Sequence, residues 1–214
     1  MHRDNTKEAP VSERIQNGLS HHRAGRLKEA EAIYQSVLRE QPRNPQVLYL
    51  MGLMAHQLGK HEMAVDLLKN AIKVNPDVPD FHNTCGEAQR ALQKPELAIA
   101  CYERALALKP DYVEAHNNLG VALQAQGRPE NAISSYERAI GINPDIAEIH
   151  RNLGIVLQEL GRTEDAIVSL EKSLSINPDY AEAHNNLGLS LQVLDQHRGA
   201  ISCFERALAI NTDF

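Results

Sequence analysis

Residues 113–146 read VEAHNNLGVALQAQGRPENAISSYERAIGINPDI, a 34-residue stretch whose pattern recurs along the chain. Counting in blocks of this length from Val11 gives six repeats, within which we number the positions 1 to 34. The repeats are residues 11–44, 45–78, 79–112, 113–146, 147–180 and 181–214, and they follow an N-terminal tail of residues 1–10. Self-similarity at a fixed period of this length is typical of proteins that stack one small structural unit many times.

Three repeat positions carry nearly the same residue throughout. Position 8 is glycine in all six repeats: Gly18, Gly52, Gly86, Gly120, Gly154 and Gly188. Position 20 is alanine in all six: Ala30, Ala64, Ala98, Ala132, Ala166 and Ala200. Position 32 is proline in five: Pro42, Pro76, Pro110, Pro144 and Pro178. The small residues allow two helices to approach closely, and proline ends the second helix before the next repeat begins.

Apolar residues recur at helical spacing over positions 2–14 and 18–31 of each repeat, which predicts two amphipathic helices. Position 15 is glycine in four repeats, where a left-handed cap would follow the first helix. Larger apolar side chains occupy positions 24 and 28, as Tyr136 and Ile140 do in the fourth repeat. A single helical hairpin of this size cannot bury its apolar face alone, so we expect neighbouring hairpins to stack.

The pattern resembles the tetratricopeptide repeat (TPR) family over residues 11–214. The residues at family positions in the fourth repeat are Leu119, Gly120, Leu123, Ala132, Tyr136, Ala139 and Pro144. The resemblance implies an all-α fold, a right-handed superhelical solenoid of six helix-turn-helix hairpins with about twelve helices. It also implies a protein–protein interaction scaffold in which the first helix of each hairpin lines a concave groove for an extended peptide segment.

The composition excludes several classes of partner. Lys and Arg number 22 against 28 Asp and Glu, so the net charge is −6, which argues against nucleic acid and against an anionic membrane surface. No long apolar run is present, and residues 1–10 do not resemble a signal peptide. The three cysteines do not suggest a disulfide framework. We therefore expect a cytoplasmic protein with free thiols.

The sequence contains no catalytic motif, and we expect the chain as given not to be an enzyme and to use no cofactor. Histidine recurs at position 4, as His82, His116, His150 and His184. Equivalent positions of stacked helices are separated by ~8–10 Å, too far for neighbouring imidazoles to share one ion. We therefore expect these histidines to fill space between repeats and to bind no metal.

Repeats four to six share a polar pattern on their first helices. Position 2 gives Glu114, Glu148 and Glu182; position 6 gives Asn118, Asn152 and Asn186; position 12 gives Gln124, Gln158 and Gln192. These spacings keep the side chains on one helical face. Because an amide both donates and accepts, the asparagines could pair with the main chain of a peptide, and the glutamates would favour a basic one. The alternative is a polar helix face that only contacts solvent.

The same helices resemble the TPR arm of O-linked N-acetylglucosamine transferases, in which a concave asparagine ladder holds protein substrates. That resemblance implies an alternative function: an N-terminal arm that recruits substrates for a larger transferase whose catalytic domain lies outside this chain. A second alternative is a self-assembling structural protein. Its contact would be the C-terminal repeat, where Ile201, Phe204 and Leu208 are as apolar as the corresponding residues of interior repeats.

The first two repeats predict a different surface. Ile15, Leu19, Tyr49, Leu50 and Leu53 occupy positions 5, 6 and 9, so the groove is apolar there. An apolar patch on an exposed surface usually marks a contact site. Its occupant could be residues 1–10, an apolar anchor of a peptide, or a second chain.

Overall fold

A computed structural model of the chain describes residues 9–211, so the greater part of the predicted tail, residues 1–8, lies outside the described residues. The described part is all-α, as predicted, and contains twelve helices and no strand. The helices are α1 (Val11–Arg23), α2 (Leu27–Glu40), α3 (Pro45–Gln57), α4 (His61–Val74), α5 (Pro79–Ala91), α6 (Pro95–Leu108), α7 (Val113–Ala125), α8 (Pro129–Ile142), α9 (Ala147–Glu159), α10 (Thr163–Ile176), α11 (Ala181–Val193) and α12 (His197–Ile210).

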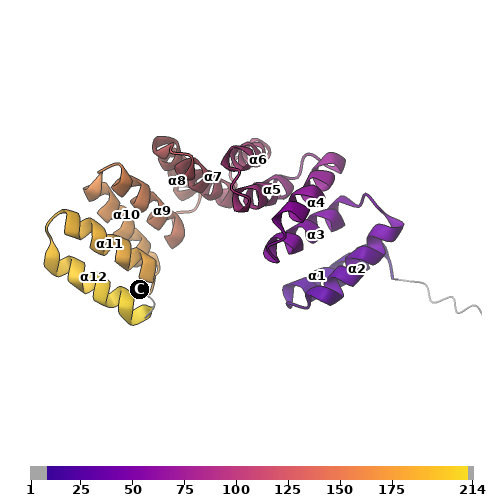
Figure 1. Cartoon of the computed structure of the whole chain (residues 1–214), viewed down its shortest axis with the longest axis horizontal. Helices are drawn as coiled ribbons and strands as arrows, with labels where there is room; N and C mark the ends of the chain where they lie inside the picture. The colour runs from indigo at the N-terminus through magenta and orange to yellow at the C-terminus, as the bar shows by residue number, and fades with distance from the viewer. Residues whose placement is uncertain (1–8, 212–214) are drawn as a thin grey trace, which may run out of the picture. The chain divides into compact units, whose positions relative to one another are not determined.

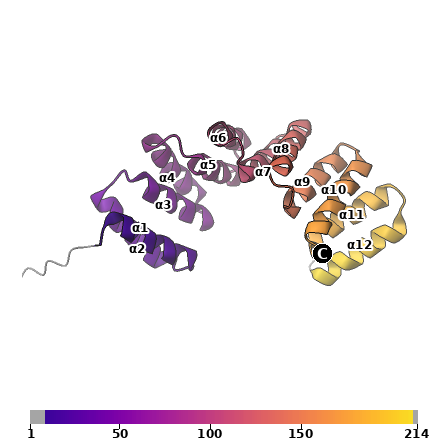
Figure 2. The same ribbon diagram turned by 180° about the vertical axis from the view of Figure 1, so that it is seen from behind.

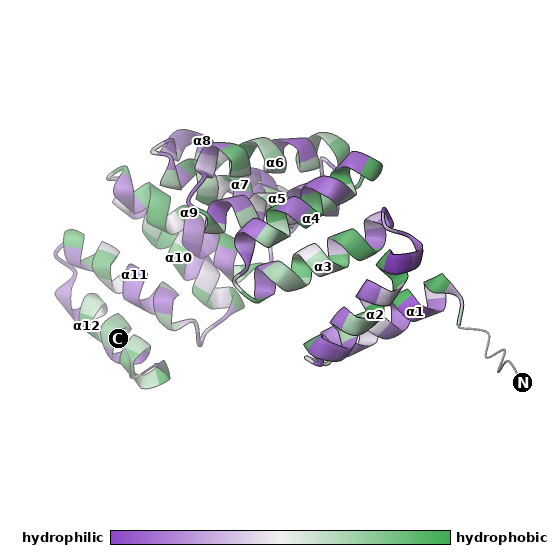
Figure 3. Ribbon diagram, turned by 45° about the vertical axis from the view of Figure 1, so that its right-hand side comes forward, coloured by the Kyte–Doolittle hydropathy of each residue, from purple (hydrophilic) through white to green (hydrophobic). Residues whose placement is uncertain are grey.

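The helices pair into hairpins, and the hairpins form two compact units, Met1–Leu108 and Lys109–Phe214. Within each hairpin the two helices lie side by side, as Figures 1 and 2 show. In the first unit α2 packs on α3 and α4 on α5, and the first helices α1, α3 and α5 follow one another. The second unit repeats this arrangement with α7, α9 and α11. Figure 3 shows hydrophobic and hydrophilic residues interspersed along the helices, as expected for amphipathic helices.

Each helix begins and ends one residue before the predicted bounds, at repeat positions 1–13 and 17–30. The end of the second helix has a local cause, because position 31 precedes proline and such residues avoid the helical region. Asn75 before Pro76 shows this: its backbone is extended, with φ −135° and ψ 93°, while its N–H still bonds to the Ala71 carbonyl. The start at position 1 is favoured in α3 and α5 by Pro45 and Pro79, since proline suits the first helical turn.

The glycine at position 8 faces a large side chain of the second helix at close range. A Cβ atom added to Gly120 would lie 2.5 Å from Cε1 of Tyr136, the residue at position 24. The other five glycines meet the residue at position 24 in the same way, at 2.5–2.8 Å. The alanines at position 20 are at most 3% exposed. The large residue at position 24 therefore packs directly on the glycine. This contact explains why glycine recurs at position 8 and a large apolar residue at position 24.

The predicted left-handed glycines are present at position 15. Gly25, Gly59, Gly127 and Gly161 have φ of 71–73°. In the remaining two repeats the same conformation is imposed on Gln93, with φ 58°, and on Asp195, with φ 56°. A side chain on Cβ disfavours this region, more for glutamine than for aspartate.

Replacing Gln93 by glycine should therefore raise the free energy of unfolding by ~1 kcal/mol, and Asp195→Gly should raise it by less. Urea unfolding followed by circular dichroism measures the change. The matched control is Gly127→Ala, which should destabilise the protein by a similar amount although nothing lies within 4 Å of the added Cβ. A Gln93→Gly variant that is no more stable than the parent would show that the hairpin turn carries no such strain.

Tyr34 at position 24 is fully buried, and its hydroxyl has no hydrogen-bond partner among the described residues. Burial raises the pKa of Tyr34 from 10.0 to about 12, although the charge of Arg23 opposes the shift. The neutral phenol is thus favoured in the folded state. Because the unfolded chain loses this proton first, stability should fall as the pH rises above 10.

Tyr34→Phe should therefore raise the free energy of unfolding at pH 7, by up to ~1–3 kcal/mol, and reduce its fall between pH 10 and 12. Phenylalanine fits this position, since Phe204 occupies it in the sixth repeat. Thermal unfolding over this pH range is the measurement. As a control, Tyr136→Phe removes a hydroxyl that donates to Oε1 of Gln124 at 3.5 Å, and it should bring no gain at pH 7. Equal effects of the two substitutions would contradict this explanation.

Candidate peptide-binding surfaces

The histidines at position 4 anchor each first helix to the loop that precedes it. Nε2 of His82, His116, His150 and His184 lies 2.8–2.9 Å from the carbonyl oxygen of the proline that ends the preceding hairpin. A carbonyl only accepts, so each Nε2 carries the proton and donates. Sequence reasoning expected these side chains to fill space between repeats, but it missed the hydrogen bond. Among residues 9–211, no group of three or more His, Cys, Asp or Glu is placed to hold a metal ion.

The asparagines at position 6 do not form a uniformly accessible row. Asn152 is only 8% exposed and lies at the seam between α7 and α9. Its Nδ2 donates to Oδ1 of Asn117 at 3.1 Å, and its Oδ1 accepts from Nη1 of Arg151 at 3.1 Å. Asn118 and Asn186 are partly exposed, and Nδ2 of Asn186 is buried with no hydrogen-bond partner among residues 9–211. The bond to Asn117 joins two repeats, the bond to Arg151 lies within α9, and the amide has one further N–H and one further lone pair.

Arg151 is a residue of this surface that sequence reasoning missed. Its guanidinium lies 5.7 Å from the ring centre of Tyr180, which precedes α11. Burial raises the pKa of Tyr180; the charge of Arg151 lowers it, and the charges of Glu148 and Glu182 raise it. A positive charge thus lies among the glutamates of position 2, which are all exposed. The signal was available, since position 5 lies beside positions 2 and 6 on the same helical face.

The glutamines at position 12 differ in their contacts. Gln124 donates through Nε2 to Oε1 of Glu159 at 2.8 Å, which links α7 to α9. Gln158 is partly exposed and Gln192 is exposed. The second unit therefore presents amide groups at positions 6 and 12 along three neighbouring first helices, and some of these amides also bond between the helices.

The first unit contains a cavity of about 700 Å³ between α1, α3 and α5. Four of the five predicted patch residues line it: Leu19, Tyr49, Leu50 and Leu53. The prediction was wrong for Ile15, which is 3% exposed and packs in the core in one cluster with Tyr34 of α2 and Val47 of α3. Sequence reasoning missed other lining residues, among them His22, Arg23, Val78 and Phe81.

Aromatic stacking and hydrogen bonding fix the walls of this cavity. The rings of Tyr49 and Phe81 stack with their centres 5.0 Å apart. On the opposite side, Nε2 of His22 lies 2.7 Å from Oε1 of Gln57. Arg23 adds a charged group beside the apolar wall. The cavity can therefore accept an apolar side chain next to polar main-chain groups.

Family comparisons agree with the repeat pattern. Tetratricopeptide repeat models match residues 21–88, 83–147 and 181–214, and a TPR repeat model matches residues 156–195. This chain belongs to the tetratricopeptide repeat family. No curated protein matches it in sequence. Within the described part of the chain, no helix is both long enough and apolar enough to cross a membrane.

Solved structures share the fold. A crystal structure of MamA is 25% identical with a TM-score of 0.70, over 76% of this chain and 95% of that one. The Pseudomonas aeruginosa protein PilF is 15% identical with a TM-score of 0.84, over 94% and 92%. YrrB, described as a TPR protein with an unusual peptide-binding site, is 17% identical with a TM-score of 0.68, over 84% and 93%. At these identities the likeness establishes the fold.

Proposed function

We propose that this chain is a non-catalytic protein-interaction module that binds an extended protein segment along the first helices of its hairpins. The observation that carries the proposal is the recurrence of amides at positions 6 and 12 on α7, α9 and α11, which lie next to one another. Amides can pair with a peptide main chain whatever its side chains. Support comes from YrrB, a TPR protein with a peptide-binding site, and from the shared fold.

Side chains of the bound segment would be selected differently by the two units. In the second unit, exposed Glu114, Glu148 and Glu182 favour Lys or Arg, and Arg151 restricts this preference to part of the surface. In the first unit, the cavity beside Tyr49 and Leu53 suits an aliphatic or aromatic anchor. We therefore expect ligands with a basic stretch, a large apolar residue, or both.

A peptide array probed with the wild-type chain tests this function. Hits should contain extended, unstructured sequences, and their affinities should be measured in solution. A basic hit should bind more weakly as salt rises, because exposed charges are screened within ~10 Å at 0.1 M salt. An array without hits that survive in solution would contradict the proposal.

A second candidate function is a substrate-recruiting arm of a larger transferase. The recurrent asparagine at position 6 of α7, α9 and α11 is the observation that favours it. The catalytic domain would be encoded beyond residue 214 of the same gene, so the downstream sequence decides. A glycosyltransferase-like domain there would support this candidate, and an unrelated continuation would exclude it.

Self-association through the C-terminal repeat is a third candidate. Ile201 at position 21 is 56% exposed and Leu208 at position 28 is 46% exposed. At position 21 of other repeats, Val65 and Ile133 are only 6–7% exposed. Mass measured at two protein concentrations tests this candidate. A monomer at both would exclude it, and a dimer that Ile201→Asp dissociates would support it.

A further inference from the structure

An ion pair links consecutive repeats outside the surfaces described above. Position 33, in the loop after the second helix, is aspartate in five repeats, and position 26 of the second helix is Arg or Lys in the last four. The aspartate of one repeat faces the arginine of the next: Arg104 donates to Asp77 at 3.3 Å, and Arg206 donates to Asp179 at 2.8 Å. A carboxylate therefore fits beside position 26 at these junctions.

The junction between the first two repeats has a positive charge where the other junctions have a carboxylate. Position 33 is Arg43 where the other repeats have aspartate, and position 26 is Asn70 where the later ones have a cation. Lys73, one turn along α4, adds a second positive charge. Among residues 9–211, neither Arg43 nor Lys73 forms an ion pair. This junction thus lacks the internal carboxylate that its counterparts contain.

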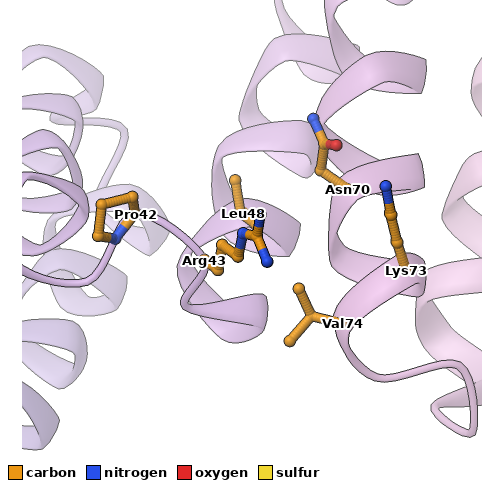
Figure 4. Close-up of a pocket in the computed structure, with 6 residues that line it drawn as sticks. All are labelled: Pro42, Arg43, Leu48, Asn70, Lys73 and Val74. Carbon is orange, nitrogen blue, oxygen red and sulfur yellow. The ribbon is translucent and has the colours of Figure 1, made fainter.

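These residues surround a pocket of about 470 Å³, shown in Figure 4. Pro42 and Arg43 come from the loop between α2 and α3, Leu48 from α3, and Asn70, Lys73 and Val74 from α4. None of the described residues that line the pocket is a carboxylate, in a chain whose net charge is −6. Leu48 is 7% exposed and Val74 is 43% exposed, so part of the wall is apolar.

The loop that carries Arg43 is fixed from both sides. Oδ1 of Asn44 accepts from the Val47 N–H at 3.1 Å and caps α3, and Nδ2 of Asn44 donates to Oε1 of Gln41 at 2.8 Å. Pro45 begins the helix directly afterwards. The backbone at Arg43 is therefore held in place before a ligand arrives, which reduces the entropy lost on binding.

We propose that this pocket binds a carboxylate side chain of an acidic protein segment, with an aliphatic residue of that segment against Leu48 and Val74. Arg43 and Lys73 supply the positive charges and Asn70 an amide donor, as charge complementarity requires. The site is independent of the proposed groove function: it uses the loop and the second helix, and it selects acidic rather than basic ligands. Since the cations are exposed, we expect binding in the millimolar range for a short probe.

The test uses the full chain labelled with ¹⁵N and two short probes, acetyl-Leu-Glu-Leu amide and its matched acetyl-Leu-Gln-Leu amide. Only the glutamate probe should shift the backbone amide resonances of residues 43–44 and 70–74. The double variant R43D/N70R rebuilds the aspartate–arginine pair of the other junctions, so it should fold normally and bind the probe roughly tenfold more weakly or worse. Lys172→Gln, which changes the net charge by the same amount but lies in the second unit, should leave binding as in the parent.

Several outcomes would overturn the proposal. Equal binding of the glutamine probe would show that no carboxylate is recognised, and equal binding by R43D/N70R would place the interaction elsewhere. A chain that starts at residue 9 tests whether Asp4 or Glu8 of the same chain occupies the pocket. If the same resonances shift when residues 1–8 are deleted and no probe is present, the chain's own N-terminus is the occupant. If they shift with protein concentration, the occupant is a second copy.

Discussion

Replacing Gly120 by alanine is expected to lower the free energy of unfolding by about 1–3 kcal/mol, although alanine is intrinsically more favourable than glycine in a helix by ~1 kcal/mol. The added Cβ would lie 2.5 Å from Cε1 and 2.7 Å from Cζ of Tyr136. That ring is fully buried and its hydroxyl bonds to Gln124, so moving it would disturb the surrounding core. The two helices of the hairpin must separate instead. Urea unfolding measures the loss.

The matched control lies one helix further on. Gly141 is near the end of α8, and an added Cβ there meets nothing within 4 Å. Gly141→Ala should therefore raise the free energy of unfolding by ~0.5–1 kcal/mol. The same substitution thus has opposite signs at two glycines of one hairpin. If Gly120→Ala were also stabilising, packing of position 24 on position 8 would not determine the hairpin geometry.

The sequence predicted the fold well because its signals are local and repeated. Glycine at position 8 and alanine at position 20 each have one structural reason that applies in every hairpin, and proline at position 32 has one that applies in five. A repeat whose sequence departs from the pattern keeps the same backbone conformation. Gln93 adopts the same left-handed turn as Gly127, because the packing of the two helices fixes the turn between them. The second helices of five repeats end one residue early for a reason visible in sequence, the proline that follows position 31.

The candidate site was harder to predict because its contacts join different repeats. Helical periodicity places Asn152 on the correct face, but it does not reveal that Asn117 of the preceding repeat bonds to it. Nor does it separate Ile15, which is buried in the core, from Leu19, which lines the cavity. Such distinctions depend on the distance and angle between neighbouring helices. These are set by side chains more than thirty residues away in the chain.

Changing Asn118, Asn152 and Asn186 together to alanine should weaken binding of an extended peptide to the second unit. Each lost hydrogen bond contributes ~0.5–1.5 kcal/mol net, so three would contribute ~1.5–4.5 kcal/mol. That corresponds to roughly a 10- to 2,000-fold rise in Kd. The measurement is a titration with peptides found on the array.

The control must separate a lost ligand contact from a loosened seam between α7 and α9. Asn117→Ala breaks the same bond to Asn152 at 3.1 Å, but it leaves all three position-6 amides in place. If the asparagines bind the peptide main chain, Asn117→Ala should change Kd much less than the triple substitution does. A triple Glu114, Glu148 and Glu182 to Gln variant should weaken only basic peptides, mainly at low salt. Should the triple alanine variant bind every hit as tightly as the parent, the asparagines serve only to join repeats, and the peptide must bind elsewhere.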